Sequence, residues 1–318
     1  MGVSVLKYSA SSDELITVTP LPRWKVMLQE KASILSRNPA AHRVLSALLL
    51  FGAPGIGAYA HWVEPTWLKV RRLTLPLYRL PMEFDGFRIV HLSDLHMGST
   101  VPSEFLQHVM QTVQKLAPDL VVLTGDFVHT KPDEVAELTT LLRHLQAPSG
   151  VFAVLGNHDY GANYPGDSRL LGVEDVVITA LERAGITVLR NDWVPITAGA
   201  HRFALMGVDE LWSGQASVAP LRTVPTAYSR VVLCHNPDVF SFLPAQNFDL
   251  LLCGHTHGGQ VRLPPFPPLL TATTNRRLWG GLTAHEHSWV FVSRGIGYTW
   301  RVRFASRPEC VEITLKKS

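Results

Sequence analysis

Cysteine and charge are both scarce in this chain. It has three cysteines in 318 residues, too few and too scattered for a disulfide framework. Cys234 and Cys253 lie inside apolar runs, where a thiol behaves as a small buried hydrophobe. Charged residues make up 17% and the net charge is +3, which is mild for a surface that binds nucleic acid, so no nucleic-acid partner is expected. The hydrophobic fraction of 46% excludes a disordered chain and allows a large core.

One uncharged stretch is long. Residues 44–63 carry no formal charge, and as a helix they would span about 30 Å, the thickness of a bilayer core. Tyr59 and Trp62 stand where interfacial aromatic residues are expected. The stretch predicts a single membrane anchor. A cleaved signal peptide and a buried or interfacial helix are the alternatives.

The anchor divides the chain into four parts. Residues 1–43 form an extension of unknown role, 44–63 the anchor, 64–83 a linker and 84–318 the main folded domain. Basic residues flank the anchor on both sides, so the positive-inside rule does not fix which side of the membrane the domain faces. Membrane association is therefore expected, with the side left open.

Short apolar strands alternate with amphipathic helices from Phe87 onwards. Ser103 is expected to cap a helix whose apolar residues recur at helical spacing as far as Leu116, and Asp133 to open another. This alternation predicts an α/β fold. Strands are predicted at 87–92, 119–124, 151–155, 186–189, 203–208, 230–234, 249–253, 289–293 and 310–315.

Polar clusters directly follow five of these strands. In an open α/β sheet, ligands bind in the crevice beyond the carboxyl ends of the strands, so we expect the clusters to converge. They offer only nitrogen and oxygen donors, which suit Mn, Fe, Zn, Co or Mg rather than a thiolate-bound structural metal. Glycines 125, 156 and 254 let the backbone turn sharply beside a charged ligand. The clusters are Asp94-Leu95-His96, Gly125-Asp126, Gly156-Asn157-His158-Asp159, His235-Asn236 and Gly254-His255-Thr256-His257.

In this order the clusters resemble the calcineurin-like metallophosphoesterase superfamily, from about Phe84 to Leu315. Four further segments resemble its bacterial membrane-associated phosphodiesterase branch, which is similar to the UDP-2,3-diacylglucosamine pyrophosphohydrolases of lipid A synthesis. The resemblance implies a sandwich of two β-sheets flanked by α-helices. Together with the anchor helix predicted from residues 44–63, it indicates a location at the bacterial inner membrane. The segments are Asp85–Val90, Gly254–Gln260, Ser293–Gly295 and Arg307–Glu309.

The resemblance also implies two divalent metal ions. Asp126 would bridge them, which brings two cations close while partly neutralising their repulsion. A water between the ions would lose its proton near neutral pH and act as the in-line nucleophile. The first ion would be held by Asp94, His96, Asp126 and His257, and the second by Asp126, Asn157, His235 and His255.

Two residues beside the expected metal ligands are given catalytic roles by the same resemblance. His158 would stabilise a phosphoryl oxygen and donate a proton to the leaving oxygen. Asp159 would orient and charge the imidazole of His158.

The predicted function is therefore metal-dependent hydrolysis of a phosphodiester or diphosphate, such as UDP-2,3-diacylglucosamine or another lipid or nucleotide-sugar conjugate. A phosphomonoesterase or a nuclease with the same site is an alternative. A non-catalytic, membrane-anchored scaffold is another, although no position of the metal-binding pattern is missing. The sequence does not predict an oligomeric state.

Three weaker candidates have ordinary structural explanations. His285-Glu286-His287 could bind metal or form a polar loop. Arg276, Arg277 and Arg294 could grip a diphosphate or lie on the solvated surface. An acyl-chain entrance or simple loop packing would account for Phe266, Leu269, Leu270 and Trp279.

Overall fold

The computed structural model describes residues 52–98, 101–129, 135, 137–162, 173–244, 247–268 and 271–318. The chain divides into two compact units, Met1–Ile56 and Gly57–Ser318. Nearly all described residues belong to the second unit, which contains both sheets and every predicted site residue.

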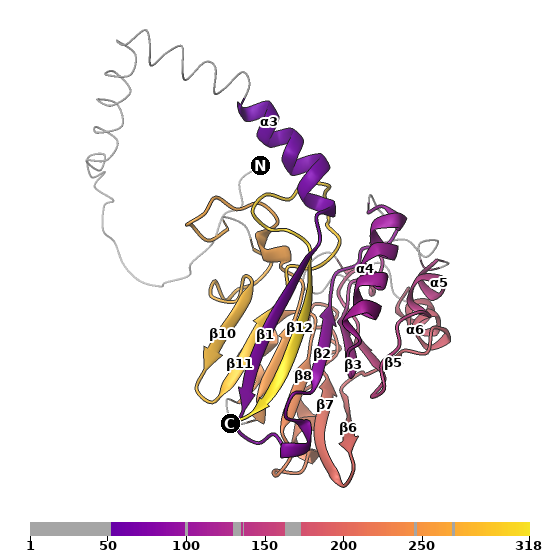
Figure 1. The fold of residues 1–318 in the computed structure, drawn as a ribbon, viewed down its shortest axis with the longest axis vertical. Helices are drawn as coiled ribbons and strands as arrows, with labels where there is room; N and C mark the ends of the chain where they lie inside the picture. Colours follow the sequence, from indigo (N-terminus) through magenta and orange to yellow (C-terminus); the bar gives the residue numbers. More distant parts are fainter. Residues whose placement is uncertain are drawn as a thin grey trace, which may run out of the picture. The chain divides into compact units, whose positions relative to one another are not determined.

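Two six-stranded sheets form the second unit (Figure 1). The first has the strand order β1-β12-β2-β3-β4-β5, and the second has the order β10-β11-β9-β8-β7-β6. The first sheet comprises β1 (Lys69–Leu77), β12 (Glu309–Lys317), β2 (Arg88–Leu92), β3 (Leu120–Thr124), β4 (Val151–Val154) and β5 (Thr187–Val188). The second comprises β10 (Gly281–His285), β11 (Ser288–Val292), β9 (Leu250–Cys253), β8 (Arg230–Leu233), β7 (His201–Gly207) and β6 (Asp192–Ala198).

Apolar residues from both sheets form one shared core. Ile89 and Val122 of the first sheet belong to the same buried cluster as Leu205, Val231 and Leu252 of the second. Each of these five side chains is fully buried. The predicted sandwich of two sheets is thus confirmed.

Helices cover the outer face of the first sheet. α4 (Ser103–Leu116), α5 (Leu138–Leu142) and α6 (Val173–Arg183) lie along β2 to β5, and their apolar faces share a second buried cluster with the outward side chains of those strands (Figure 1). α4 begins at Ser103 as expected, but Pro102 occupies the N-cap position and no side chain caps the helix. Asp133 lies outside the described residues.

The central strands run parallel. In the first sheet β2, β3, β4 and β5 are parallel neighbours, and in the second sheet β7, β8, β9 and β11 are. Their carboxyl ends therefore lie at a common edge within each sheet. All nine predicted strands are present within a few residues of their expected bounds, while β1, β6 and β10 were not predicted.

The predicted linker over residues 64–83 is wrong. Residues 69–77 form β1, which pairs in parallel with β12 from Lys69↔Glu309 to Leu77↔Lys317. β1 is an edge strand, so its outer positions carry charge and it tolerates Pro76, and both features hide its strand pattern. The folded domain therefore begins well before residue 84.

The predicted anchor over residues 44–63 lies mostly outside the described residues. Its described part contains α3 (Ala53–Ala58) and the π-helical turn η2 (Tyr59–Val63). Within the described ranges, no helix combines the length and apolar character needed to cross a membrane. Residues 57–63 group with the large folded unit rather than with the segment that precedes it.

Candidate metal centre

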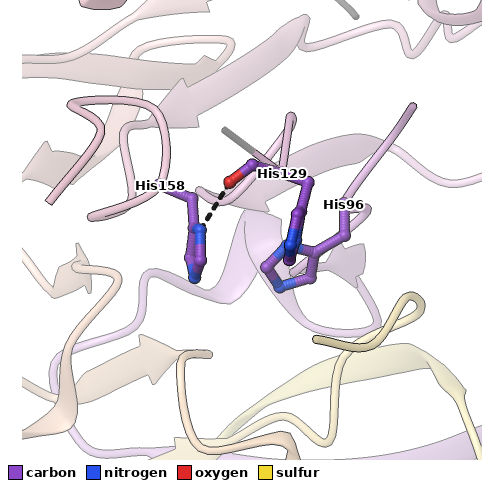
Figure 2. Close-up of side chains that lie close together, drawn as sticks. All are labelled: His96, His129 and His158. Atoms are coloured by element: carbon purple, nitrogen blue, oxygen red, sulfur yellow. Dashed lines mark hydrogen bonds between the residues drawn. The ribbon is translucent and has the colours of Figure 1, made fainter. Parts of the chain in front are cut away.

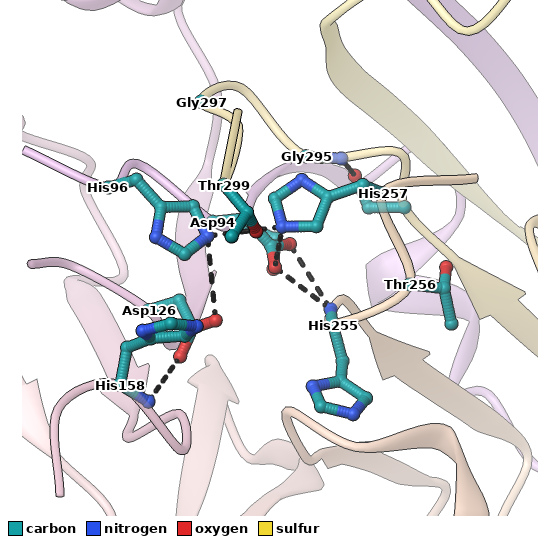
Figure 3. A network of polar contacts seen from close by, with 12 residues as sticks. Asp94, His96, Asp126, His158, His255, Thr256, His257, Gly295, Gly297 and Thr299 are labelled. Atoms are coloured by element: carbon teal, nitrogen blue, oxygen red, sulfur yellow. Dashed lines mark hydrogen bonds and ion pairs between the residues drawn. The ribbon is translucent and has the colours of Figure 1, made fainter. Parts of the chain in front are cut away.

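The five polar clusters converge where the strand ends of the two sheets meet. Backbone hydrogen bonds continue the ladders past the strands: Asp94 N donates to Gly125 O at 2.9 Å, and Gly254 N donates to His235 O at 3.0 Å. The two sheets are joined here as well, because His255 N donates to Asp94 Oδ1 at 3.0 Å. Loops up to 161 residues apart in sequence thus form one site (Figure 3).

Asp94, His96 and His257 form the first ligand-like group. Nε2 of His96 lies 3.1 Å from Nε2 of His257, and the latter lies 3.6 Å from Asp94 Oδ1. All three residues are buried, and their donor atoms lie within 4.8 Å of one another. A carboxylate with two imidazoles at this spacing can surround a divalent cation.

The second group contains Asp126, His235 and His255. His235 Nε2 lies 3.1 Å from Asp126 Oδ2 and 3.2 Å from Nδ1 of His255. The other ring nitrogen of His235, Nδ1, lies 2.7 Å from the carbonyl oxygen of Thr124, so it must carry the proton that it donates there. In the neutral ring, Nε2 then presents a lone pair to a carboxylate, an arrangement that requires a cation or a second proton.

Asp126 also approaches the first group. Its Oδ2 atom, which faces His235, lies 3.6 Å from Nε2 of His96. One carboxylate therefore stands between the two groups, as a bridging ligand must.

The side chain of Asn157 has the orientation of a ligand. Its Nδ2 donates to Ala162 O at 2.7 Å, which turns Oδ1 the other way. Among the described residues, buried Oδ1 has no hydrogen-bond partner. A buried amide oxygen without a partner is costly, and coordination of a cation would satisfy it.

Burial and neighbouring charges set the protonation of the site. Burial raises the pKa of Asp94 to about 6. Burial alone would lower the pKa of His235, but the charge of Asp126 raises it to about 10. The pKa of His255 is lowered to about 3 by burial and then by the charge of His235, and that of His257 lies well below its ordinary value because of burial and then Arg303. His255 and His257 thus stay neutral, the form that binds metals.

Three glycines allow this close approach. A Cβ atom on Gly156 would collide with Oδ1 of Asp126, and one on Gly254 would collide with the side chains of Ser93 and Asp94. Gly125 has a positive φ of 79°, and a Cβ atom on it would collide with the backbone of Gly156. The expectation that these glycines bring the backbone close to the ligands is confirmed.

His158 lies beside the first group together with a residue that the sequence interpretation missed. Its Nδ1 lies 2.5 Å from the backbone oxygen of His129 (Figure 2). The two rings are stacked at 19°, and the ring of His96 is edge-on to that of His158 at 4.8 Å. The signal that could have found His129 is its place three residues after Asp126, on the same loop.

The structure gives Asp159 a different role from the predicted one. Its buried carboxylate accepts hydrogen bonds from the backbone N–H groups of Asp126, Phe127 and Gly156, each at 2.8 Å. The ring of His158 instead bonds to His129 O. Asp159 therefore ties two ligand-bearing loops together, rather than orienting His158. It could do so because its side chain points back toward the strand ends, a direction that sequence spacing does not reveal.

The buried guanidinium of Arg303 was also missed. Its Nη2 lies 3.4 Å from Nδ1 of His257, and it donates to the backbone oxygens of Arg294 and Gly297. Burial lowers the pKa of Arg303 to about 10, so it remains a cation at neutral pH. Arg303 follows no strand and belongs to no pattern, which explains why the sequence did not reveal it.

The weaker candidates fall outside the two ligand-like groups, although Trp279 lies beside them, where its backbone oxygen accepts from Thr256 Oγ1 at 2.8 Å. His285 is at the end of β10 with its ring edge-on to Phe240, and the metal-type groups found in the described part of the chain do not include it. Trp279 lies under the guanidinium of Arg262, at 4.7 Å. Phe266 is 69% exposed, whereas Leu269 and Leu270 lie outside the described residues.

The fold and the site together define an α/β protein with a buried carboxylate and imidazole centre able to hold divalent cations. The chain belongs to the calcineurin-like phosphoesterase family, whose sequence model matches residues 87–259. It is therefore a phosphoesterase, as the sequence predicts.

Three relatives resemble most of the chain. Phosphodiesterase YaeI of Escherichia coli is 32% identical over 277 residues, which cover 85% of this chain and 96% of YaeI. The uncharacterized metallophosphoesterase YkuE of Bacillus subtilis is 31% identical over 284 residues, which cover 85% of this chain and 96% of YkuE. The UDP-2,3-diacylglucosamine pyrophosphatase LpxG of Chlamydia muridarum is 30% identical over 79% of this chain and 90% of LpxG. The predicted likeness to the pyrophosphohydrolase branch is confirmed.

Proposed function

We propose that this chain hydrolyses a phosphodiester or diphosphate with two divalent cations held side by side. The observation that carries the proposal is the position of Asp126, whose Oδ2 faces His235 at 3.1 Å and His96 at 3.6 Å. Two ligand-like groups thus share one carboxylate, the arrangement of two-metal phosphoesterases.

The proposal divides the ligands as the family resemblance implies. Asp94, His96 and His257 would hold one cation and Asn157, His235 and His255 the other, with Asp126 contacting both. When bound, Mn, Fe, Zn, Co or Mg would lower the pKa of a water to near 7, so that it acts as nucleophile, and would polarise the phosphoryl oxygens. The donor set does not single out one of these metals.

His158 is proposed as the proton donor to the leaving oxygen. Its Nδ1 is engaged with His129 O at 2.5 Å, which fixes the ring and leaves Nε2 for the substrate. Its backbone N–H donates to Asp126 Oδ1 at 2.9 Å, so the backbone of His158 is tied to the shared carboxylate (Figure 3). The ring of His129, which stacks on the ring of His158, limits the rotation of the His158 side chain.

The proposed substrate class is a lipid-linked or nucleotide-linked phosphodiester or diphosphate. The names of the relatives YaeI and LpxG support it, since one is a phosphodiesterase and the other acts on UDP-2,3-diacylglucosamine. UDP-2,3-diacylglucosamine, and with it lipid A synthesis, is the specific candidate that follows.

Attachment to the bacterial inner membrane through residues 44–63 is also a proposal. Large apolar side chains are exposed on three segments that touch one another: Tyr59 packs on Phe304, the Arg307 guanidinium lies over Trp67, and Val261 bridges to Phe304. Exposed aromatic residues close to a proposed anchor suit the interfacial zone of a bilayer. They are Trp62, Trp67, Phe266 and Trp300.

Parallel assays test the function. The full chain, stripped with a chelator and reloaded with Mn²⁺, would be given UDP-2,3-diacylglucosamine, bis-p-nitrophenyl phosphate, p-nitrophenyl phosphate and single-stranded DNA. We expect hydrolysis of the first two, lost on stripping and restored on reloading. Preference for the monoester or for DNA would overturn the proposed substrate class, and a metal-loaded chain inert on all four would support a scaffold.

A further inference from the structure

Glu64 is a buried carboxylate just ahead of the first strand. It opens the 3₁₀ turn η3 (Glu64–Thr66) and is only 1% exposed. A carboxylate so buried needs compensating hydrogen bonds. They come from the far end of the chain: Oε2 accepts from Ala305 N at 3.0 Å and Oε1 from Ser306 N at 2.6 Å.

The turn held by Glu64 has an unfavourable backbone conformation. Ala305 has a φ of 52°, in the left-handed region that costs energy for a residue with a side chain. Such a conformation persists only where its surroundings fix it. The two hydrogen bonds that the charged Glu64 carboxylate accepts supply that constraint. A backbone hydrogen bond from Arg303 N to Ala60 O, at 2.9 Å, also holds the turn.

The other side of the same turn touches the metal centre. Ser306 Oγ donates to the backbone oxygen of His257 at 2.8 Å. Arg303 Nη1 donates to Ser306 O at 2.7 Å, and Nη2 of the same guanidinium lies 3.4 Å from the ring of His257. His257 itself has a positive φ of 50°, so its ring position also depends on outside contacts.

We propose that Glu64 is a positioning residue for the metal centre, because its carboxylate fixes the 303–306 turn and that turn places His257. Glu64 lies in the segment that the sequence assigns to a linker directly after the anchor. The segment that leads into the folded domain is therefore part of the machinery that holds one of the two cations. The inference rests on the proposed role of His257 as a ligand.

Metal titration tests the inference. The full chain stripped with a chelator would be titrated with Mn²⁺, and bound ions counted by equilibrium dialysis. Changing residues that support a ligand typically weakens metal binding about 10- to 100-fold. Glu64→Gln is therefore expected to weaken the binding of one of the two ions by that factor and to leave the affinity for the other unchanged. Turnover is measured separately and does not enter the count.

Two further variants sharpen the test. Asp119→Asn is the matched control. Asp119 Oδ2 also accepts a hydrogen bond from a backbone N–H, that of Arg88 at 2.8 Å. However, Asp119 lies just before β3, at the end of that strand opposite the metal centre. This variant is expected to bind both ions normally. Ser306→Ala removes the hydroxyl that bonds His257 O but keeps the backbone N–H that bonds Glu64, and it is expected to reproduce the effect of Glu64→Gln. If Glu64→Gln does not fold, normal metal binding by Ser306→Ala would still overturn the link between the turn and His257.

The outcomes separate the inference from the proposed function. If the unaltered chain binds two ions and His257→Ala loses one, but Glu64→Gln and Ser306→Ala bind both normally, the positioning role is overturned and the binuclear centre stands. If the unaltered chain binds fewer than two ions, or His257→Ala changes nothing, the proposed function fails first, and the positioning role with it.

Discussion

Asp126 Oδ2 lies 3.1 Å from Nε2 of His235, and the other nitrogen of that ring is committed to Thr124 O at 2.7 Å. With Nδ1 protonated, Nε2 must carry either a second proton or a bound cation to face a buried carboxylate at this distance. Only a positive charge between them makes the contact favourable.

Asp126→Asn should lose both bound ions, because one carboxylate serves two ligand groups. Loss of several kcal/mol of metal stabilisation lowers kcat by about 100-fold or more. Metal content by mass spectrometry and turnover of bis-p-nitrophenyl phosphate check the prediction. Retention of both ions would contradict the bridging role.

His158→Ala should retain both ions and lower kcat by about 100- to 10,000-fold, the usual range for loss of a general acid. Its ring could surround an ion only together with His96 and His129, because among the described residues no ligand-like group combines His158 with a carboxylate. The same metal count with the same assay checks the result. A loss of metal would show that His158 is itself a ligand.

Asp159→Ala should destabilise the fold, because it leaves four buried N–H groups without their acceptor, those of Asp126, Phe127, Val128 and Gly156. At about 1 to 3 kcal/mol for each unsatisfied group, the free energy of unfolding should fall by roughly 3 kcal/mol or more. Urea unfolding measures it. Unchanged stability with an altered pH dependence of kcat would instead favour the orienting role predicted from sequence.

Gly156→Ala should weaken metal binding by about 10- to 100-fold, because the added methyl group displaces the carboxylate of Asp126. Gly57→Ala is the control, since a Cβ at that position meets nothing within 4 Å. Calorimetric titration with Mn²⁺ compares the two. Equal affinities would mean that the site relaxes around the methyl group.

A chain beginning at Gly57 should be markedly more stable than one beginning at Lys69. The shorter chain lacks Glu64, whose two charged hydrogen bonds contribute about 1.5 to 3 kcal/mol each. A loss of roughly 3 kcal/mol lowers the unfolding midpoint by about 6 to 12 °C in a domain of this size. Thermal unfolding of the two chains gives the difference, and equal midpoints would contradict the packing of residues 57–68 onto the domain.

The sequence revealed those parts of the molecule whose causes are local. Strands such as β3 and β9, buried on both faces, are uninterrupted apolar runs, and the polar residues that end them stand out. This contrast made Asp126 and His255 predictable. The resemblance to a known family then supplied their expected roles.

The parts that were missed depend on contacts between distant residues. β1 is recognisable only through its partner β12, which lies 240 residues further along. The roles of Asp159 and Arg303 follow from the direction of their side chains, which no spacing in the sequence specifies. His129 contributes its backbone oxygen to His158, and a backbone atom leaves no trace in residue type.

The pairing of β1 with β12 has a consequence for synthesis of the protein. β12 is an interior strand, flanked by β1 on one side and β2 on the other, yet the ribosome delivers it after the other eleven strands of the described residues. Until it emerges, β1 and β2 both expose unpaired edges, the kind of surface that promotes aggregation. The nascent chain is therefore expected to depend on chaperones until β12 has been synthesised, and a stop codon only a few residues before Glu309 should leave both of these edges unpaired.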